Sequence, residues 1–253
     1  MKSILIIKIG DNNMAIKTKR MSDWLAQNGE AITAASKASM LKAVNDEVTQ
    51  LQDGVFIMHH RAGNNFPLAI PPHKWVSGYQ SAGEIADGVL LVEGGHHLVI
   101  APTETQLPWA GGNSDTGAYR TGDRLAAMQD WAGKDNTAKI IAASKDGAIT
   151  NTEAYAAGFC NKYSRANGNG IGLTAGRWWL PSVAELMMIY ANMAKINHAL
   201  SLIDGAQQLS ENWYWASTEG SSSSAWFLSL NVGFLSWTGK SSSNKVRPVS
   251  AFL

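Results

Sequence analysis

The sequence predicts an α+β fold that is rich in short strands and loops. Of its 253 residues, 45% are hydrophobic and only 16% are charged, and it contains 24 glycines and 10 tryptophans. An ordinary globular domain has about 25% charged residues, and tryptophan is rarely so frequent. This composition favours many strands and turns over a helical bundle. Within it, residues 181–196 have the apolar spacing of a helix, and residues 225–230 alternate as a strand does.

Charge and cysteine content exclude several classes of function. The net charge is +1 and the lysines and arginines are dispersed, so neither a nucleic acid nor a membrane surface is an expected partner. Cys160 is the single cysteine, so no intrachain disulfide can form and a Cys/His zinc site is not expected. No stretch reaches the ~20 apolar residues of a membrane span, and we therefore expect no membrane insertion.

Residues 1–53 are predicted to contain a leader and a helical segment. Residues 1–10 lack a small-residue cleavage pattern, so we expect a strand or a leader there rather than a signal peptide. Further along, Leu41, Val44, Val48 and Leu51 follow the 3-4-3 spacing of a coiled-coil seam. Only about two heptads are present, which is marginal for an isolated helix. Two interpretations stay open: a short oligomerising stalk, and a helix that packs on its own domain.

Residues 54–114 are predicted to form a β-rich region. Short runs of β-branched, aromatic and other apolar residues are separated by Gly, Pro and Asn, which is typical of strands and turns. The predicted strands are 54–60, 74–79, 88–95 and 96–102. The run AGGNSDTG at 110–117 is predicted to be a loop, and we place a domain boundary near residue 115.

Residues 115–253 are predicted to form a second domain. Helices are expected at 123–131 and 152–163, with a strand-like segment at 138–143 between them and a glycine-rich loop at 167–172. The best-defined helix begins at Pro181. Ser182 stands three residues before Glu185, which is the spacing of a capping box. Its apolar residues are expected in the core: Leu186, Tyr190, Met193 and Ile196.

The chain ends in a predicted β hairpin and a closing strand. In residues 225–230, Trp226, Leu228 and Leu230 share one face of the strand, whereas Phe227 and Ser229 share the other. A turn is expected at 231–233, a return strand at 234–238, a loop at 241–244 and a final strand at 246–249. Trp215 and Trp226 are expected in the core.

The C-terminal motifs resemble bacterial and phage C-type-lectin-like domains. Those domains carry the patterns WxLPSxxEL, YWxSTE, AW and VRPV in this order, and the resemblance covers roughly residues 120–253. Some members are variable proteins of diversity-generating retroelements, phage tail-tip proteins and bacterial surface proteins among them. The matching residues are Trp179, Leu180, Pro181, Ser182, Glu185, Leu186, Tyr214, Trp215, Ser217, Thr218, Glu219, Ala225, Trp226, Val246, Arg247, Pro248 and Val249.

The resemblance implies a C-type-lectin-like fold, related to that of the formylglycine-generating enzymes, which displays a ligand-binding surface. The partner would be a protein or glycan receptor on a bacterial cell surface, the location a phage tail or a bacterial surface, and the assembly a homotrimer, as is common for such fibre-tip proteins. A bacterial adhesin or fimbrial component that is not diversified is the alternative, and an enzyme is a third. The calcium motifs of animal C-type lectins are absent, so calcium-independent binding is expected.

The expected ligand-binding residues lie between the motifs that carry the resemblance, and they have the composition of a recognition surface. Aromatic residues there would supply rigid contact area, and Ser, Gly and Asn adaptable hydrogen bonds. Phe227 and Phe234 oppose the core residues in phase and are expected to be exposed; for Trp237, which shares its phase with Leu235, exposure and burial stay open. The predicted site is Trp213, Gly220, Ser221, Ser222, Ser223, Ser224, Phe227, Ser229, Val232, Phe234, Ser236, Trp237, Thr238, Gly239, Ser241, Ser242, Ser243 and Asn244.

Neither a catalytic site nor a cofactor is predicted. The pairs His59–His60 and His96–His97 do not predict a metal site, because adjacent residues of a strand point to opposite faces. Cys160 stands alone in an apolar setting that is typical of a structural thiol. No Gly-x-Ser-x-Gly elbow or Ser-His-Asp arrangement is apparent.

Overall fold

In the computed structural model, residues 3–8, 15–20, 52–61, 67–167 and 169–252 are described. The chain divides into two compact units, residues 1–52 and residues 53–252. In the first unit, β1 (Ser3–Lys8) pairs with β2 (Ala15–Arg20) in an antiparallel hairpin. The predicted seam at Leu41, Val44, Val48 and Leu51 lies outside the described residues.

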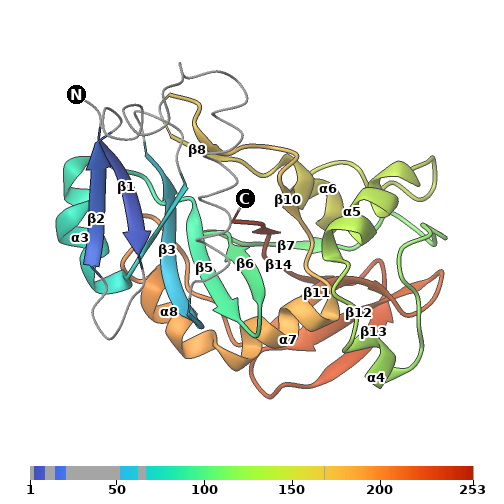
Figure 1. Ribbon diagram of the computed structural model, residues 1–253. Helices are drawn as coiled ribbons and strands as arrows, with labels where there is room; N and C mark the ends of the chain where they lie inside the picture. Colours follow the sequence, from blue (N-terminus) through green and yellow to red (C-terminus); the bar gives the residue numbers. More distant parts are fainter. Residues whose placement is uncertain (1–2, 9–14, 21–51, 62–66, 168, 253) are drawn as a thin grey trace, which may run out of the picture. The chain divides into compact units, whose positions relative to one another are not determined.

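The second unit contains two large sheets, which Figure 1 shows together with their helices. The six-stranded sheet has the order β10-β15-β6-β5-β3-β4, and the five-stranded sheet has the order β13-β12-β11-β14-β7. The first consists of β3 (Gly54–His60), β4 (Pro67–Ile70), β5 (Gly88–Glu93), β6 (His96–Ile100), β10 (Trp178–Trp179) and β15 (Val249–Ser250). The second consists of β7 (Thr105–Pro108), β11 (Trp213–Glu219), β12 (Ser224–Ser229), β13 (Leu235–Gly239) and β14 (Ser243–Val246).

The remaining elements are mostly helices. They are α3 (Pro72–Gly78), the 3-10 turn η1 (Gln80–Ala82), α4 (Arg124–Ala127), α5 (Gly133–Ala142), α6 (Ala156–Lys162), α7 (Val183–Ala191) and α8 (Met193–Leu200), and a small hairpin joins β8 (Arg165–Ala166) to β9 (Gly172–Leu173). The predicted α+β class is therefore confirmed. No helix among the described residues has the length and apolar character needed to cross a membrane.

The boundary expected near residue 115 does not separate two units. β6 pairs with β15 from the end of the chain, and β7 pairs with β14. Both large sheets thus contain strands from the two sides of the expected boundary. Because these pairings join residues far apart in sequence, the turn-rich segment at 110–117 could not reveal them.

Two predicted strands are helices in the structure. Residues 74–79 lie mostly in α3, which has a proline in its first turn, where the fixed φ of proline favours a helix start. Residues 138–143 lie almost entirely in α5, whose buried residues include Asn136, Thr137 and Ile140. That spacing is helical. Short apolar runs fit both periods, so the tertiary contacts decide between them. The loop expected at 241–244 is shorter than predicted, because β14 begins at Ser243.

Two hydrophobic clusters lie on opposite faces of the five-stranded sheet. One contains Tyr214, Trp226 and Leu228 from this sheet, and joins them to α7, α8 and the six-stranded sheet. The other contains Trp215 and Phe227, together with residues of α5 and α6. Trp215 and Trp226 are both fully buried, so the prediction that they belong to the core is confirmed.

The helix start at Ser182 is confirmed. Ser182 is the N-cap of α7, and the Glu185 carboxylate accepts its backbone N–H at 2.8 Å. The Ser182 hydroxyl, although it occupies the capping-box position, makes no hydrogen bond of ordinary geometry. Trp179 Nε1 also donates to Glu185, at 3.1 Å. The carboxylate therefore ties the start of α7 to the strand before it.

Arg247, in the VRPV sequence, is fully buried and joins three chain segments. Its guanidinium donates to the carbonyls of Ala101 and Gln207, each at 2.9 Å, and to Glu104 Oε2 at 2.8 Å. A buried arginine with a carboxylate and carbonyl partners is stabilised by its planar fork of donors. The motif residue thus has a structural role.

We expect the protein to lose stability between pH 4.5 and 7 because of Glu185. Burial raises the pKa of Glu185 from its ordinary 4.5 to about 7, so the folded state holds a proton that the unfolded state has released. The stability from this proton is complete below pH 4.5 and is lost as the pH rises through 7. Thermal melting of the wild type and of Glu185→Gln at pH 5 and pH 8 measures this.

The comparison of these two proteins isolates Glu185. Burial lowers the pKa of His59, which gives the opposite dependence on pH but acts equally in both proteins. The wild type should lose more Tm than Glu185→Gln on going from pH 5 to pH 8. Parallel changes in the two proteins would mean that Glu185 is ionised throughout.

Candidate functional site

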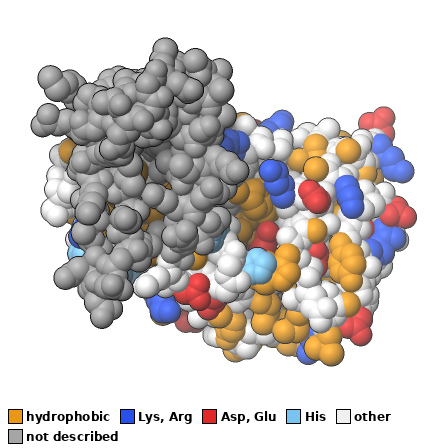
Figure 2. All heavy atoms as spheres, viewed as in Figure 1, with side chains coloured by type: hydrophobic (Ala, Val, Ile, Leu, Met, Phe, Trp, Pro, Cys, Tyr) orange, Lys and Arg blue, Asp and Glu red, His pale blue; other side chains and the backbone are white. Residues whose placement is uncertain are grey.

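Three large aromatic side chains are exposed on the β11–β13 part of the five-stranded sheet. Trp213 is 48% exposed, Phe234 49% and Trp237 48%. Figure 2 shows hydrophobic side chains reaching the surface in the region where α7 and the C-terminal strands lie. Half-exposed tryptophan and phenylalanine rings are costly to leave in water, and aromatic residues are enriched at recognition surfaces.

Trp213 and Phe234 belong to an aromatic row that crosses three neighbouring strands. The Trp213 ring stacks on the Phe227 ring with centroids 4.6 Å apart, and Phe234 lies 6.3 Å from Phe227 on its other side. Trp213 is on β11, Phe227 on β12 and Phe234 directly before β13. The two exposed rings therefore flank a shared, covered ring on one face of the sheet.

The expected exposure of Phe227 and Ser229 was wrong, because each is only 3% exposed. The alternation along β12 does place Phe227 opposite Trp226, as predicted. However, this second face of the sheet is covered by its own hydrophobic cluster, and Trp213 lies over Phe227. Phe227 is thus a support for the exposed rings.

Trp237 lies on the other face of the sheet. It is paired across the strands with Trp226, and the two rings meet edge to face at 4.9 Å. A Cβ on Gly220 would lie 3.0 Å from Trp237 Cγ and 2.9 Å from Ser224 Oγ, so this loop approaches the ring closely. The structure therefore brings Trp237 together with the 220–224 loop, and Trp213 with Phe234.

The other predicted site residues differ in exposure. Ser224 and Asn244 are buried, which contradicts a surface role for their side chains. The remaining residues are exposed or partly exposed: Gly220, Ser221, Ser222, Ser223, Val232, Ser236, Thr238, Gly239, Ser241, Ser242 and Ser243.

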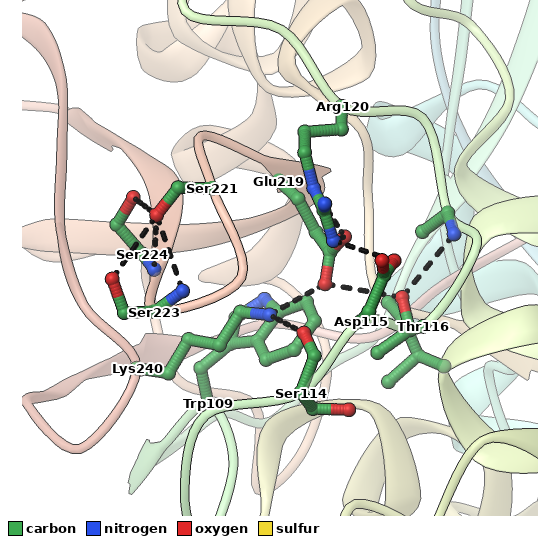
Figure 3. Close-up of polar contacts among 12 residues, drawn as sticks. Trp109, Ser114, Asp115, Thr116, Arg120, Glu219, Ser221, Ser223, Ser224 and Lys240 are labelled. Atoms are coloured by element: carbon green, nitrogen blue, oxygen red, sulfur yellow. Dashed lines mark hydrogen bonds and ion pairs between the residues drawn. The ribbon is translucent and has the colours of Figure 1, made fainter.

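The 220–224 loop is braced by hydrogen bonds among its own serines, as Figure 3 shows. Ser221 Oγ accepts the backbone N–H groups of Ser223 and Ser224, both at 3.1 Å. It also lies 2.8 Å from Ser224 Oγ. The Ser222 carbonyl accepts the N–H of Ser114, which links the loop to the 110–117 segment. Fixing a loop before it binds reduces the entropy lost on binding.

A buried ion cluster lies at the base of this loop. Glu219, fully buried at the end of β11, accepts from Lys240 Nζ and from Arg120 Nη2, the latter at 2.9 Å. Thr116 Oγ1 donates to the same carboxylate at 3.1 Å. Arg120 also donates to Asp115, which is largely exposed, at 2.7 Å. Figure 3 shows that these groups converge on the Glu219 carboxylate.

Lys240 is enclosed on every side. Its Nζ donates to the Ser114 carbonyl at 2.7 Å and lies 4.4 Å from the centroid of the Trp109 ring. Burial lowers the pKa of Lys240, whereas the Glu219 carboxylate opposes this change. A cation between a carboxylate, a carbonyl and an aromatic face remains compensated. The cluster therefore joins the 110–117 segment to Glu219 at the end of β11 and to Lys240, which directly follows β13.

The sequence did not reveal this cluster. Glu219 was identified only as a motif residue, and Lys240 and Arg120 were not singled out. The one signal in the sequence was that Lys240 is the single charged residue of the segment 220–244. An isolated charged residue in such a segment could equally well point into solvent. Only the fold brings its partners from residues 109–120 close to it.

The neighbouring histidines His59 and His60 diverge, as the alternation of a strand predicts. His59 Nδ1 lies 3.5 Å from Glu84 Oε2, and its ring packs edge to face against both Trp75 and Tyr79. His60 Nδ1 lies 2.9 Å from Asp87 Oδ2. The two rings thus have separate partners and do not face a common point.

No protein-family model and no curated protein matches this sequence. Among solved structures, the chain is similar to a fimbrial protein from Bacteroides ovatus ATCC 8483, with 13% identity and a TM-score of 0.38. The match covers 80% of this chain and 44% of the fimbrial protein, so this chain spans less than half of that protein's length. The geometry of the described residues therefore carries the functional proposal.

Proposed function

We propose that this protein binds a receptor through the exposed aromatic residues of its C-terminal sheet, on a scaffold of the C-type-lectin-like type. The observation that carries the proposal is the exposure of Trp213, Phe234 and Trp237 within one small part of the sheet. Such rings act as anchors when a partner covers them. The receptor would be a protein or glycan of a bacterial cell surface.

The contrast between the buried motif residues and the exposed residues that lie between the motifs supports this proposal. The motif residues Trp215, Trp226 and Arg247 are fully buried, whereas the residues between the motifs supply the exposed rings and the serine loops. A scaffold of this kind tolerates changes at its exposed positions, because surface substitutions usually alter stability by only about 0.5 kcal/mol.

The location that fits the proposal is a phage tail or a bacterial surface. Two versions differ in the origin of the exposed residues: a variable protein diversified by a retroelement, and a surface adhesin or fimbrial component that is not diversified. The gene neighbourhood distinguishes them. A reverse-transcriptase gene and a near-copy of the C-terminal coding segment beside this gene would support the first, and their absence would support the second.

We expect the double variant Trp213→Ser/Phe234→Ser to remain folded and to lose binding. Both rings are about half exposed, so their loss should cost about 1–2 kcal/mol of stability, mainly through their contacts with Phe227. Anchors of this kind typically contribute 2 kcal/mol or more to binding, which is a loss of affinity of about 30-fold. Fluorescently labelled protein, applied to a panel of bacterial strains, measures the binding, and thermal melting measures the fold.

Val76→Ser is the matched control. Val76 is 44% exposed on α3, a helix that contacts β3 of the six-stranded sheet. This control removes a smaller hydrophobic side chain of similar exposed fraction and should leave binding unchanged. Retained binding by the folded double variant would place the receptor site elsewhere.

A further inference from the structure

We propose that the outer edge of β13 pairs with an extended peptide segment of a partner protein, which adds a strand to the five-stranded sheet. This inference rests on the proposed function and specifies the chemistry of its partner. β13 is an edge strand, since the sheet order begins at β13 and continues to β12. An edge strand presents N–H and C=O groups that another strand can satisfy.

The direction of these backbone groups follows from the hairpin. At one end, the Ser229 N–H donates to the Phe234 carbonyl at 2.9 Å; at the other, the Lys240 N–H donates to the Ser223 carbonyl at 3.0 Å. Hydrogen-bonded and non-hydrogen-bonded pairs alternate along an antiparallel ladder. Ser236 therefore directs its backbone groups toward β12.

By the same alternation, Thr238 faces β12, and Leu235, Trp237 and Gly239 direct their backbone groups outward. The Gly239 carbonyl accepts the N–H of Ser242 at 2.9 Å, so a local turn satisfies it. Among the described residues, these three outward positions make no other backbone hydrogen bond beyond the hairpin. The N–H and C=O of Trp237 lie at the centre of this edge.

β13 also lacks the devices that protect other sheet edges. Natural edge strands are protected by charge, by proline or by short length. The edges formed by β4 and β7 contain Pro67 and Pro108, and the edge formed by β10 has only two residues. β13 has five residues, LSWTG, with neither a charge nor a proline. Of the four edges of the two large sheets in the described structure, it is therefore the best suited to pair.

The exposed aromatic rings stand on both faces of this edge. Phe234 lies beside Phe227 on one face, whereas Trp237 lies against Trp226 on the other. A ligand that rests on one face of the sheet would reach only one of these rings. An added strand presents side chains alternately to both faces, so it can cover Phe234 and Trp237 together. This arrangement favours an extended peptide over a glycan.

Two variants at one position separate the ring from the backbone. Trp237→Ala removes the ring alone, whereas Trp237→Pro removes the ring and also the outward N–H. Proline is tolerated on an edge strand where the N–H faces away from the sheet. The probe is a peptide selected from a displayed random-peptide library on the wild-type protein, and fluorescence anisotropy measures its affinity for the three proteins.

We expect Trp237→Ala to weaken peptide binding, and Trp237→Pro to weaken it about tenfold further, because one main-chain hydrogen bond is lost. Equal affinities of the two folded variants would overturn the inference. The inference would also be overturned if no peptide selected from the library competed with the recognised bacterial strains for binding to the wild-type protein. The proposed function would survive either result if the Trp213→Ser/Phe234→Ser variant still fails to bind those strains.

Amide hydrogen exchange of the wild-type protein tests the same inference if Trp237→Pro fails to fold. The selected peptide should slow exchange at the outward N–H groups of Trp237 and Gly239, while Ser236 and Thr238 are already protected by β12. Unchanged exchange at Trp237 in the peptide complex would overturn the inference. If the Trp237 N–H exchanged slowly without peptide and the protein had the mass of a dimer in solution, the occupant of the edge would be a second copy of the chain. That result would also overturn the inference.

Discussion

Replacement of Glu219 by glutamine is expected to destabilise the protein by about 3–5 kcal/mol, the range for breaking a buried ion pair by removing one partner. The substitution keeps the shape of the side chain but removes its charge. Lys240, which is 1% exposed, would then face only neutral partners, namely the new amide oxygen, the Ser114 carbonyl and the Trp109 ring. Urea unfolding followed by circular dichroism measures the change.

The double variant Glu219→Gln/Lys240→Met should recover part of this loss, because it removes both buried charges. Replacing a buried ion pair by apolar groups is often neutral, whereas leaving one charge unpaired is not. Asp115→Asn is the control, since Asp115 is 75% exposed and its pairing with Arg120 should contribute at most about 1 kcal/mol. A loss from Glu219→Gln no larger than that of Asp115→Asn would mean that the cluster does not hold the end of β11, Lys240 and the 110–117 segment together.

Trp215→Ala is expected to cost about 3–5 kcal/mol, the usual range for removing a large buried side chain. Trp215 is fully buried in the cluster between the sheet and α5 and α6, and its Nε1 donates to the Leu107 carbonyl at 3.0 Å. The substitution leaves both a cavity and a carbonyl without its partner. Thermal melting and urea unfolding measure the loss.

Trp213→Ala is a close control for this substitution. Trp213 stands two residues earlier on the same strand and, by alternation, on the same face, but it is 48% exposed. Its loss should cost roughly 1 kcal/mol, mainly through its stacking on Phe227. Equal losses of stability from the two substitutions would contradict the distinction between buried motif residues and exposed binding residues, on which the proposed function rests.

Local patterns were sufficient to predict part of this fold. Ser182 and Glu185 marked the start of α7 because a helix start needs nearby acceptors, and this requirement is local in sequence. The alternation in residues 225–230 correctly separated the faces of β12, and Trp215 and Trp226 are in the core as expected. These features depend on residues within a few positions of one another.

The features that could not be predicted depend on distant parts of the chain. Alternation showed that Phe227 and Trp226 face opposite sides, but it could not show that α5 and α6 cover the second side. Phe227 was therefore expected at the surface and is buried. Likewise, the partners of Lys240 come from β11 and from residues 109–114, more than 20 positions away.

The predicted binding residues also proved to be spatially divided. Trp213 and Phe234 lie on one face of the sheet, and Trp237 lies on the other beside the 220–224 loop. The sequence places all three in one segment, and only the register of the hairpin assigns them to faces. This division is the reason that the edge of β13, rather than a single flat surface, becomes the proposed point of contact.

Hydroxyl-radical footprinting of the protein, free and bound to cells of a strain that it recognises, tests the central claim most directly. In the free protein, Trp213, Phe234 and Trp237 should be oxidised, whereas the buried Trp215 and Trp226 should not. In the bound protein, oxidation of the three exposed rings should fall, while Val76 on α3 remains as reactive as before. Continued oxidation of all three rings in the bound state would contradict the claim that they form the receptor-binding surface.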